Sequence, residues 1–223
     1  MCGRFTLSSP AEVVAELFEL AEVPDITPRY NIAPTQPAPV VRITPEDTGR
    51  QFHMLRWGLI PFWADDPSIG ARMINARAET VKTKPAFRAA FQHRRCLVVA
   101  DGFYEWQKQE RRKQPYYIHL RGGKPFAFAG LWEHWEGPDS GPIDSCTIIT
   151  TEPNELATPL HNRMPVILHR KDYTLWLDPD ARQTNVLQPL LRPYPSEEMS
   201  AHPVSTRVNN PGNDIAECIE PLS

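Results

Sequence analysis

Residues 94–106 read RRCLVVADGFYEW and contain a well-defined strand signal. The centre of this stretch, residues 96–100, is a short run of apolar and β-branched residues, which is typical of a buried β-strand. Five further segments share this character and are also predicted to be strands: 40–43, 52–59, 116–120, 126–132 and 146–151. Strands therefore dominate the expected secondary structure.

One amphipathic helix is expected near the amino terminus. Ser9 is predicted as its N-cap, Pro10 as its first residue and Glu12 as the partner that completes a capping box. Apolar residues then recur with helical spacing until Pro24 ends the pattern: Val14, Leu17, Phe18 and Ala21. The remaining expectations are two shorter helices, at 86–93 and 173–177, and a proline-rich loop at 29–39.

Composition indicates an ordinary globular protein built from many short elements. The 223 residues are 41% hydrophobic and 23% charged, which excludes wholesale disorder. Proline is enriched, with 24 residues against a typical share of ~5%, and this disfavours a helical bundle because proline ends helices. We therefore expect a single domain over residues 1–223. Its class is α+β, with a mainly antiparallel sheet rolled into a barrel-like core and a few short helices.

No segment indicates a membrane span, an export signal or a metal site. No apolar run approaches the ~18 residues of a transmembrane helix, and the amino terminus lacks the apolar stretch of a secretory signal. The four cysteines contain no CxxC pair; they are Cys2, Cys96, Cys146 and Cys218. We expect a cytoplasmic protein with reduced thiols and without a metal or cofactor, in which Cys96 and Cys146 are buried as small hydrophobic residues.

Basic residues concentrate in the middle of an otherwise acidic chain. Between Arg72 and Lys124 there are thirteen lysines and arginines against four acidic residues, a local charge of +9 within a chain of net charge −3. Such a segment is either a solvated face or the footprint of a polyanion. Aromatic residues in or beside it favour single-stranded nucleic acid, whose bases stack on rings: Trp57, Trp63, Phe87, Phe91, Tyr104 and Trp106.

The chain begins Met1-Cys2-Gly3-Arg4, and removal of Met1 would leave Cys2 as the first residue. A terminal cysteine carries a thiol beside a free α-amine, and unperturbed pKa values of about 8.5 and 7.7–8.0 make reactive forms of both accessible near neutral pH. The amine can condense with an aldehyde to an imine, which the thiol can close into a five-membered thiazolidine. The same cysteine could instead act as a thiol nucleophile, or could simply follow the initiator.

Three further polar residues stand in sequence contexts that suit chemistry. Asn75 lies in the segment MINARAET, and Glu105 follows a predicted strand between two aromatic residues, where partial desolvation raises a carboxyl pKa. His161 precedes the run MPVIL in a proline-bounded loop, a position suited to moving a proton at neutral pH. Each also has an ordinary structural explanation, as a turn residue, a strand end or a hydrogen-bonded ring. Glu79 and Glu152 are taken as ordinary carboxylates.

Seven short motifs follow one another along about 170 residues of the chain. They are MCGRF at 1–5, RYNIAP at 29–34, WGLIPFW at 57–63, NARAET at 75–80, RRCLVVADGFYEW at 94–106, AGLW at 129–132 and HNRMPVIL at 161–168. In this order they resemble the SRAP (SOS response-associated peptidase) family, whose relatives include bacterial and eukaryotic abasic-site shields. The resemblance covers nearly the whole predicted domain and is to the short bacterial form.

The resemblance implies roles for eight residues. Cys2 matches the family's crosslinking residue, and Asn75 matches the residue that orients the terminal amine and the sugar. Glu105 matches the acid/base residue near the amine, and His161 matches the residue that helps to open the sugar ring and protonate the imine. The other four match positions that contact DNA: Arg4, Arg77, Arg163 and the aromatic residue Trp63.

The function that this resemblance implies is a DNA damage response. The protein is expected to sense abasic sites in single-stranded DNA and to shield them by a covalent thiazolidine through Cys2, after removal of Met1. Autoproteolytic peptidase action and lyase-like imine chemistry are expected, with a crosslink that is largely single-turnover. The expected partner is single-stranded DNA with abasic sites, and no membrane; the expected state is a nucleoid-associated, cytoplasmic monomer. Two alternatives stay open: an N-terminal-cysteine peptidase or amidase, and a non-covalent binder of single-stranded or modified DNA.

Overall fold

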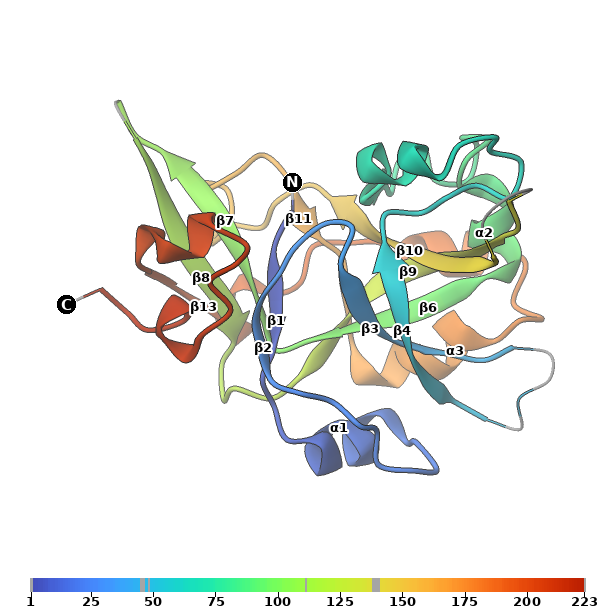
Figure 1. The fold of residues 1–223 in the computed structure, drawn as a ribbon, viewed down its shortest axis with the longest axis horizontal. Helices are drawn as coiled ribbons and strands as arrows, with labels where there is room; N and C mark the ends of the chain where they lie inside the picture. Colours follow the sequence, from blue (N-terminus) through green and yellow to red (C-terminus); the bar gives the residue numbers. More distant parts are fainter. Residues whose placement is uncertain (1, 45–46, 48, 111, 138–140, 223) are drawn as a thin grey trace.

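The computed structural model describes residues 2–44, 47, 49–110, 112–137 and 141–222. Its centre is a closed five-stranded barrel (Figure 1), made of β3 (Pro37–Arg42), β4 (Gln51–Trp57), β6 (Arg95–Ala100), β9 (Phe126–Trp135) and β10 (Ile143–Thr151). Strands pair antiparallel in the order β4-β3-β6-β9-β10, and a short parallel pairing of β10 with β4 closes the ring. The predicted α+β class with a barrel-like core is confirmed.

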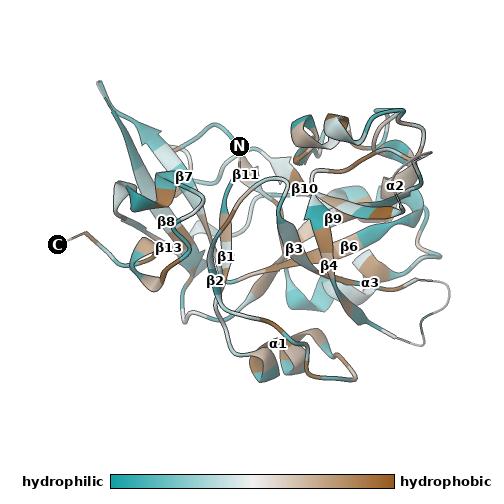
Figure 2. Cartoon of the chain, in the orientation of Figure 1, coloured by the Kyte–Doolittle hydropathy of each residue, from teal (hydrophilic) through white to brown (hydrophobic). Residues whose placement is uncertain are grey.

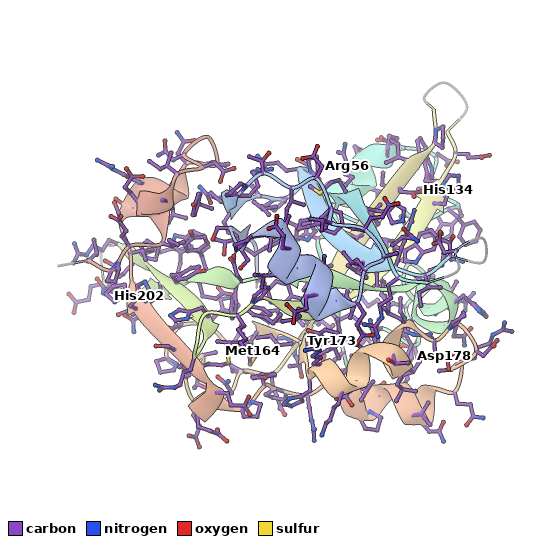
Figure 3. The ribbon with its side chains drawn as sticks, turned by 90° about the horizontal axis from the view of Figure 1, so that it is seen from below. Arg56, His134, Met164, Tyr173, Asp178 and His202 are labelled. Atoms are coloured by element: carbon purple, nitrogen blue, oxygen red, sulfur yellow. The ribbon has the colours of Figure 1, made fainter. Side chains whose placement is uncertain are left out.

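A second sheet of five antiparallel strands stands beside the barrel. Its strands, in spatial order, are β13 (Met199–Pro203), β8 (Lys113–Leu120), β7 (Gly102–Lys108), β1 (Phe5–Leu7) and β2 (Arg29–Ile32). His202 of β13 and His134 of β9 lie at opposite ends of the molecule, so the two sheets divide its length (Figure 3). The free end of β7 and β8 projects from this sheet and is hydrophilic (Figure 2).

Two predictions about this second sheet need correction. Residues 29–32 were expected to lie in a loop but form β2, because the neighbouring prolines follow at 34, 37 and 39 rather than within the strand. Glu105 was expected after a strand but lies within β7, because the turn that separates β6 from β7 is confined to Asp101 and its neighbours. The chain therefore passes directly from the barrel into the second sheet at this point.

The amino-terminal helix, α1 (Ala11–Phe18), begins without the predicted capping box. Pro10 is its N-cap, and no side chain caps the helix. The hydroxyl of Ser9 donates instead to the buried carboxylate of Asp101 at 3.1 Å, and the N–H groups of Ser8 and Ser9 donate to the same oxygen at 2.6 and 2.9 Å. The Ser9 hydroxyl thus donates to a remote carboxylate, whereas the predicted cap required it to accept from the first turn of the helix.

The remaining helices are short and lie outside both sheets. The α-helices are α2 (Arg88–His93), α3 (Tyr173–Leu177) and α4 (Thr184–Leu187). The 3₁₀ helices are η1 (Pro67–Arg72), η2 (Arg170–Asp172), η3 (Gln188–Leu190), η4 (Ser196–Glu198), η5 (Thr206–Asn209) and η6 (Ala216–Cys218). The two short helices expected from the sequence correspond to α2 and α3.

Aromatic residues join the barrel to the second sheet. Phe5 of β1 packs edge-on against Trp57 of β4 and Phe128 of β9, with ring centroids 5.0 and 5.9 Å apart. All three rings are fully buried, and burying a side chain of this size contributes about 1.5–3 kcal/mol. Cys96 and Cys146 are buried free thiols, as predicted. This packing fixes β1, and with it the start of the chain, against the barrel.

Three short strands extend the barrel sheet. β5 (Asn75–Arg77) pairs in parallel with β10, and β11 (Met164–Pro165) pairs antiparallel with β10 near its carboxyl end. β12 (Ile167–Leu168) pairs with β9. β5 contains Asn75 and Arg77, and β11 begins directly after Arg163, so both strands beside β10 position predicted site residues.

Candidate functional site

Cys2 lies directly before β1 and is fully buried. The carbonyl oxygen of Arg4 accepts a hydrogen bond from the N–H of Tyr104 at 3.0 Å, so the start of the chain runs along β7 beside Glu105. Burial raises the pKa of the Cys2 thiol well above its usual range, and the charge of Glu105 adds to this shift. The expectation of an accessible thiolate near neutral pH is therefore corrected. Met1, whose removal is predicted, lies outside the described residues.

Asn75 opens β5 and reaches the main chain of Cys2. Its Nδ2 donates a hydrogen bond to the carbonyl oxygen of Cys2 at 2.8 Å. Its Oδ1 is buried and, among the residues that the structure describes, has no hydrogen-bond partner. Leaving a buried amide oxygen without a donor costs free energy, so this atom is an acceptor for a donor that enters the site.

Glu105 lies in the middle of β7 and is only 2% exposed. Burial raises the pKa of Glu105 to about 7, in the direction that its aromatic neighbours predicted. A carboxyl group with a pKa near neutrality can both accept and return a proton at physiological pH. The start of the chain runs along β7, so the Cys2 thiol lies near Glu105, whose charge adds to the rise in the thiol pKa.

His161 follows a tight turn that begins at Asn154. The Asn154 side chain accepts a hydrogen bond from the N–H of Ala157 at 2.9 Å and donates one to the carbonyl oxygen of Tyr194 at 2.7 Å. The Nδ1 atom of His161 accepts a hydrogen bond from the N–H of Arg163 at 3.0 Å, so a neutral ring carries its proton on Nε2. Burial lowers the pKa of His161, which favours this neutral ring at neutral pH.

The segments that carry the predicted site residues meet at the carboxyl end of β10. Thr150 of β10 pairs with Arg77 of β5 on one side and with Pro165 of β11 on the other. Gln107 of β7 donates a hydrogen bond to the carbonyl oxygen of Pro159, at 3.5 Å, and so links the second sheet to the turn before His161. The second sheet contributes Cys2 and Glu105, and the barrel side contributes Asn75 and His161.

Arg4 is half-buried between the amino terminus and the carboxyl-terminal segment. One terminal nitrogen of its guanidinium donates to Asn31 Oδ1 at 2.7 Å and to the carbonyl oxygen of Val208 at 2.8 Å. The guanidinium carbon lies 5.9 Å from the ring centroid of Trp106. The structure therefore gives Arg4 internal partners, and its predicted contact with DNA stays a prediction.

Arg77 is exposed and lines a groove of about 470 Å³ that Asn75 also lines. Within the described part of the chain, its side chain makes no hydrogen bond or salt bridge. Arg72 and Lys84 line the same groove, although the sequence did not distinguish them from the rest of the basic segment. The +9 charge of residues 72–124 was the signal that could have identified them. The groove is thus a basic channel that leads to Asn75.

Arg163, in contrast, is engaged by a carboxylate. Its two terminal nitrogens donate to the two oxygens of Glu79, at 2.6 and 3.0 Å. One of them also donates to the carbonyl oxygen of Thr150 at 2.5 Å. The side chain of Arg163 is only 15% exposed, whereas that of Glu79 is 54% exposed. Glu79, taken as an ordinary carboxylate in the sequence, therefore belongs to the surroundings of the site.

Trp63 lies on an exposed turn of the segment between β4 and η1. It is 48% exposed, and the adjacent Phe62 is 60% exposed. A hydrogen bond from Trp135 Nε1 to the carbonyl oxygen of Ala64, at 2.7 Å, anchors this turn to the barrel strand β9. Two large rings are thus presented to solvent from a fixed base, which suits the predicted contact of Trp63 with DNA bases.

The described residues contain no group of three or more histidine, cysteine, aspartate and glutamate side chains that could hold a metal ion. The same residues include no helix with the length and apolar character needed to cross a bilayer.

The fold and this grouping of residues identify a family. The family model described as SOS response associated peptidase (SRAP) matches residues 1–211, and the chain belongs to this family. Abasic site processing protein YoqW from Bacillus subtilis (strain 168) is 45% identical over 224 residues, covering 99% of both chains. Abasic site processing protein HMCES from Gallus gallus is 35% identical and covers 87% of this chain and 66% of its own length.

A solved structure shares the whole architecture. The crystal structure of a protein from Bacteroides thetaiotaomicron superimposes with a TM-score of 0.88 at 27% sequence identity, covering 100% of both chains. A second one, a protein from Bordetella bronchiseptica, has a TM-score of 0.78 at 27% identity and covers 92% of this chain. The barrel and second sheet described here are therefore shared with experimentally solved proteins.

Proposed function

We propose that this protein senses abasic sites in single-stranded DNA and shields them by forming a covalent thiazolidine through Cys2. The observation that carries the proposal is the burial of Cys2 between the amide of Asn75 and the carboxyl of Glu105. The relatives from Bacillus subtilis and Gallus gallus, both named abasic site processing proteins, support the same substrate. The protein would act in the DNA damage response as a cytoplasmic monomer, once per lesion.

Opening of the sugar is the first chemical step. An abasic site is a cyclic hemiacetal in equilibrium with a small fraction of open-chain aldehyde, and opening moves a proton from the C1′ hydroxyl to the ring oxygen. His161 is suited to donate a hydrogen bond to the ring oxygen, because its neutral ring carries the proton on Nε2 while Nδ1 is held by Arg163. Water relays the proton from the C1′ hydroxyl to that oxygen. A positioned hydrogen-bond donor to an oxygen that gains negative charge contributes about 10²–10³-fold in rate.

Attack of the Cys2 α-amine on C1′ is the second step. The amine must be neutral, and Glu105, with a pKa of about 7, can accept its proton and then protonate the hydroxyl that leaves as water. Asn75 holds the carbonyl of Cys2 in place and offers its buried Oδ1 to an N–H of the amine or a hydroxyl of the sugar. Holding both reactants in register makes the reaction effectively unimolecular.

Closure of the thiazolidine is the third step. The Sγ atom of Cys2 adds to C1′ of the imine, and the nitrogen takes up the thiol proton, so no oxidant or further reactant is needed. The raised pKa of the buried thiol keeps it protonated until the imine forms. The S–C1′ bond then makes the adduct far more durable than an imine, which hydrolyses.

The amine can react only if Met1 has been removed, because an acylated amine cannot form an imine. We propose that the protein removes Met1 itself: water adds to the Met1 carbonyl carbon, Glu105 carries its proton to the Cys2 nitrogen, and free methionine leaves. Intact mass spectrometry tests this: wild type is expected to lack Met1, and Glu105→Gln to retain it. Loss of Met1 from both would assign the cleavage to a host aminopeptidase. A crosslinking-competent sample that quantitatively retains Met1 would refute the imine mechanism.

The basic groove and the exposed rings would hold the DNA strand. Arg72, Arg77 and Lys84 can contact phosphates without regard to sequence, as a lesion reader requires. Phe62 and Trp63 offer faces on which bases stack. Since Asn75 lines the groove, a strand bound there passes the buried Cys2.

Two other functions remain as outcomes of the test: an N-terminal-cysteine peptidase, and a non-covalent binder of single-stranded DNA. The raised thiol pKa of Cys2 disfavours the first, which needs a thiolate. A denaturing gel with single-stranded abasic DNA separates all three. A heat-stable shifted band supports the proposal. A shift seen only on a native gel indicates the binder, and cleavage of a test peptide without any shift indicates the peptidase.

A further inference from the structure

We infer that Glu79 is a positioning residue for His161 and that it acts through Arg163. The inference rests on the proposed function for its kinetic consequences, whereas its structural part concerns the protein alone. Glu79 is distant in sequence from His161, and none of the proposed chemical steps uses it. Three sets of hydrogen bonds connect the two residues.

The first set joins Glu79 to Arg163. Both carboxylate oxygens accept, at 2.6 and 3.0 Å, from the two terminal nitrogens of one guanidinium. Such a bidentate pair fixes the plane of the guanidinium, which a single contact does not. The pKa of Glu79 lies below its ordinary value chiefly because of this hydrogen bonding, so the carboxyl is ionised at neutral pH. Arg163 is therefore held by charge and by geometry.

The second set joins this pair to the end of β10. The carbonyl oxygen of Thr150 accepts from Arg163 at 2.5 Å and from the N–H of Ala78 at 2.9 Å. Thr150 is fully buried and pairs with Arg77 of β5, so the anchor point is part of the sheet. The guanidinium of Arg163 thus connects the segment after β5 to the segment before β11.

The third set passes from Arg163 to the ring of His161. The main-chain N–H of Arg163 can only donate, and it does so to Nδ1 of His161 at 3.0 Å. While that bond is kept, a neutral ring must carry its proton on Nε2, the atom proposed to serve the sugar oxygen. The position of the Arg163 backbone therefore decides the tautomer and orientation of His161. Holding that backbone is the role that we assign to Glu79.

Nitrogen chemical shifts of the His161 ring, measured in the protein without DNA, test the structural part. Wild type is expected to show one neutral tautomer, with Nε2 protonated and Nδ1 unprotonated. Glu79→Ala is expected to show exchange between the two tautomers, and Glu79→Gln, which keeps the length and one acceptor, an intermediate pattern. Asp180→Ala is the matched control, since it removes a surface carboxylate that faces Arg182, 3.8 Å away. A single unchanged tautomer in folded Glu79→Ala would overturn the inference.

Crosslinking kinetics test the functional part. Glu79→Ala is expected to slow crosslinking to abasic DNA about tenfold, a part of the rate that a positioned hydrogen-bond donor supplies. With an oligonucleotide whose aldehyde needs no ring opening, the same variant should differ from wild type less than twofold. The double variant with Arg163→Ala should be no slower than Arg163→Ala alone, because Glu79 acts through Arg163. Additive losses, or equal losses on both substrates, would contradict the assignment.

If the proposed function is wrong, the experiments give a different result from the one expected if only the role of Glu79 is wrong. In that case wild type and all variants would give no crosslink on either substrate, while the tautomer measurement would still decide whether Glu79 positions His161. If Glu79→Ala does not fold, Glu79→Gln supplies both measurements with a side chain of the same shape.

Discussion

The side-chain amide of Asn75 donates a hydrogen bond to the carbonyl oxygen of Cys2 at 2.8 Å. Asn75 belongs to β5, which pairs with the barrel, whereas Cys2 precedes β1 of the second sheet. The position of Cys2 therefore depends on both sheets at once. The donor is also neutral, so it orients Cys2 without adding charge beside the buried carboxyl of Glu105.

Asn75→Asp should slow crosslinking at least tenfold. A carboxylate cannot donate to the Cys2 carbonyl, and it adds a second negative charge close to Glu105. Gel assays with single-stranded abasic DNA, with and without borohydride, measure the effect, and both products should be slowed because the amine itself loses its position. Asn185→Asp, an exposed site in α4, is the control and should behave as wild type. An unaffected Asn75→Asp would remove the positioning role.

Variants of Cys2 should separate the two halves of the covalent chemistry. Cys2→Ala and Cys2→Ser keep the α-amine and lose the thiol, so they can form an imine but cannot close a thiazolidine. With borohydride present, abasic DNA should still be trapped, since reduction captures the imine before it hydrolyses. Without reductant no heat-stable band should persist, and the strand should be cut by β-elimination. A durable band from Cys2→Ala without reductant would point to another nucleophile, such as a lysine.

Glu105→Gln should change how stability depends on pH. The carboxyl pKa is about 7 in the folded protein, against about 4.3 in an unfolded chain. The folded state therefore binds the proton more tightly, and the free energy of unfolding falls as pH rises between these values, by about 4 kcal/mol at most. The variant should lack this fall. Urea unfolding at pH 5 and pH 8 measures it, with Glu152→Gln at an exposed site as control. Parallel curves for wild type and Glu105→Gln would argue against a buried, proton-binding carboxyl.

Arg77→Ala should weaken binding to all single strands, with or without a lesion. Each phosphate contact contributes about 0.7 to the slope of log affinity against log salt for single strands, so the slope should fall by about that amount. Arg163→Ala should reduce the slope less, because Glu79 already neutralises that guanidinium. Lys171→Ala, on an exposed position of η2, is the control. A loss that depends on base sequence, with an unchanged slope, would contradict a phosphate role for Arg77.

Local patterns in the sequence predicted the strands of the barrel, because runs such as 96–100 are buried on all sides and read as continuous apolar segments. The same reasoning failed where a distant residue decides the local structure. Ser9 does not cap α1; its main-chain N–H and its hydroxyl donate instead to Asp101, ninety-two residues away. No local pattern carries that information.

In the candidate site too, some properties follow from the local sequence and others depend on residues that are distant in the chain. The raised pKa of Glu105 could be predicted from its aromatic neighbours, whereas the raised thiol pKa of Cys2 could not, since it depends on the complete burial of the chain start. The pairing of Glu79 with Arg163 spans 84 residues, and only the folded structure reveals it. The proposed roles of Cys2, Asn75 and His161 stay predictions until the variants are measured.

Complete burial of Cys2 also has a consequence for the order of events during synthesis. The strand that covers the chain start is β7 (Gly102–Lys108), which the ribosome makes a hundred residues later. At about 5–20 residues per second, roughly 5–20 s pass between the appearance of Cys2 and that of β7. Until β7 is made, this burial cannot form, and the first residues are open to cellular enzymes once they have left the ribosome. Elongation speed over the first half of the message therefore sets how long a host aminopeptidase can compete with the proposed self-processing.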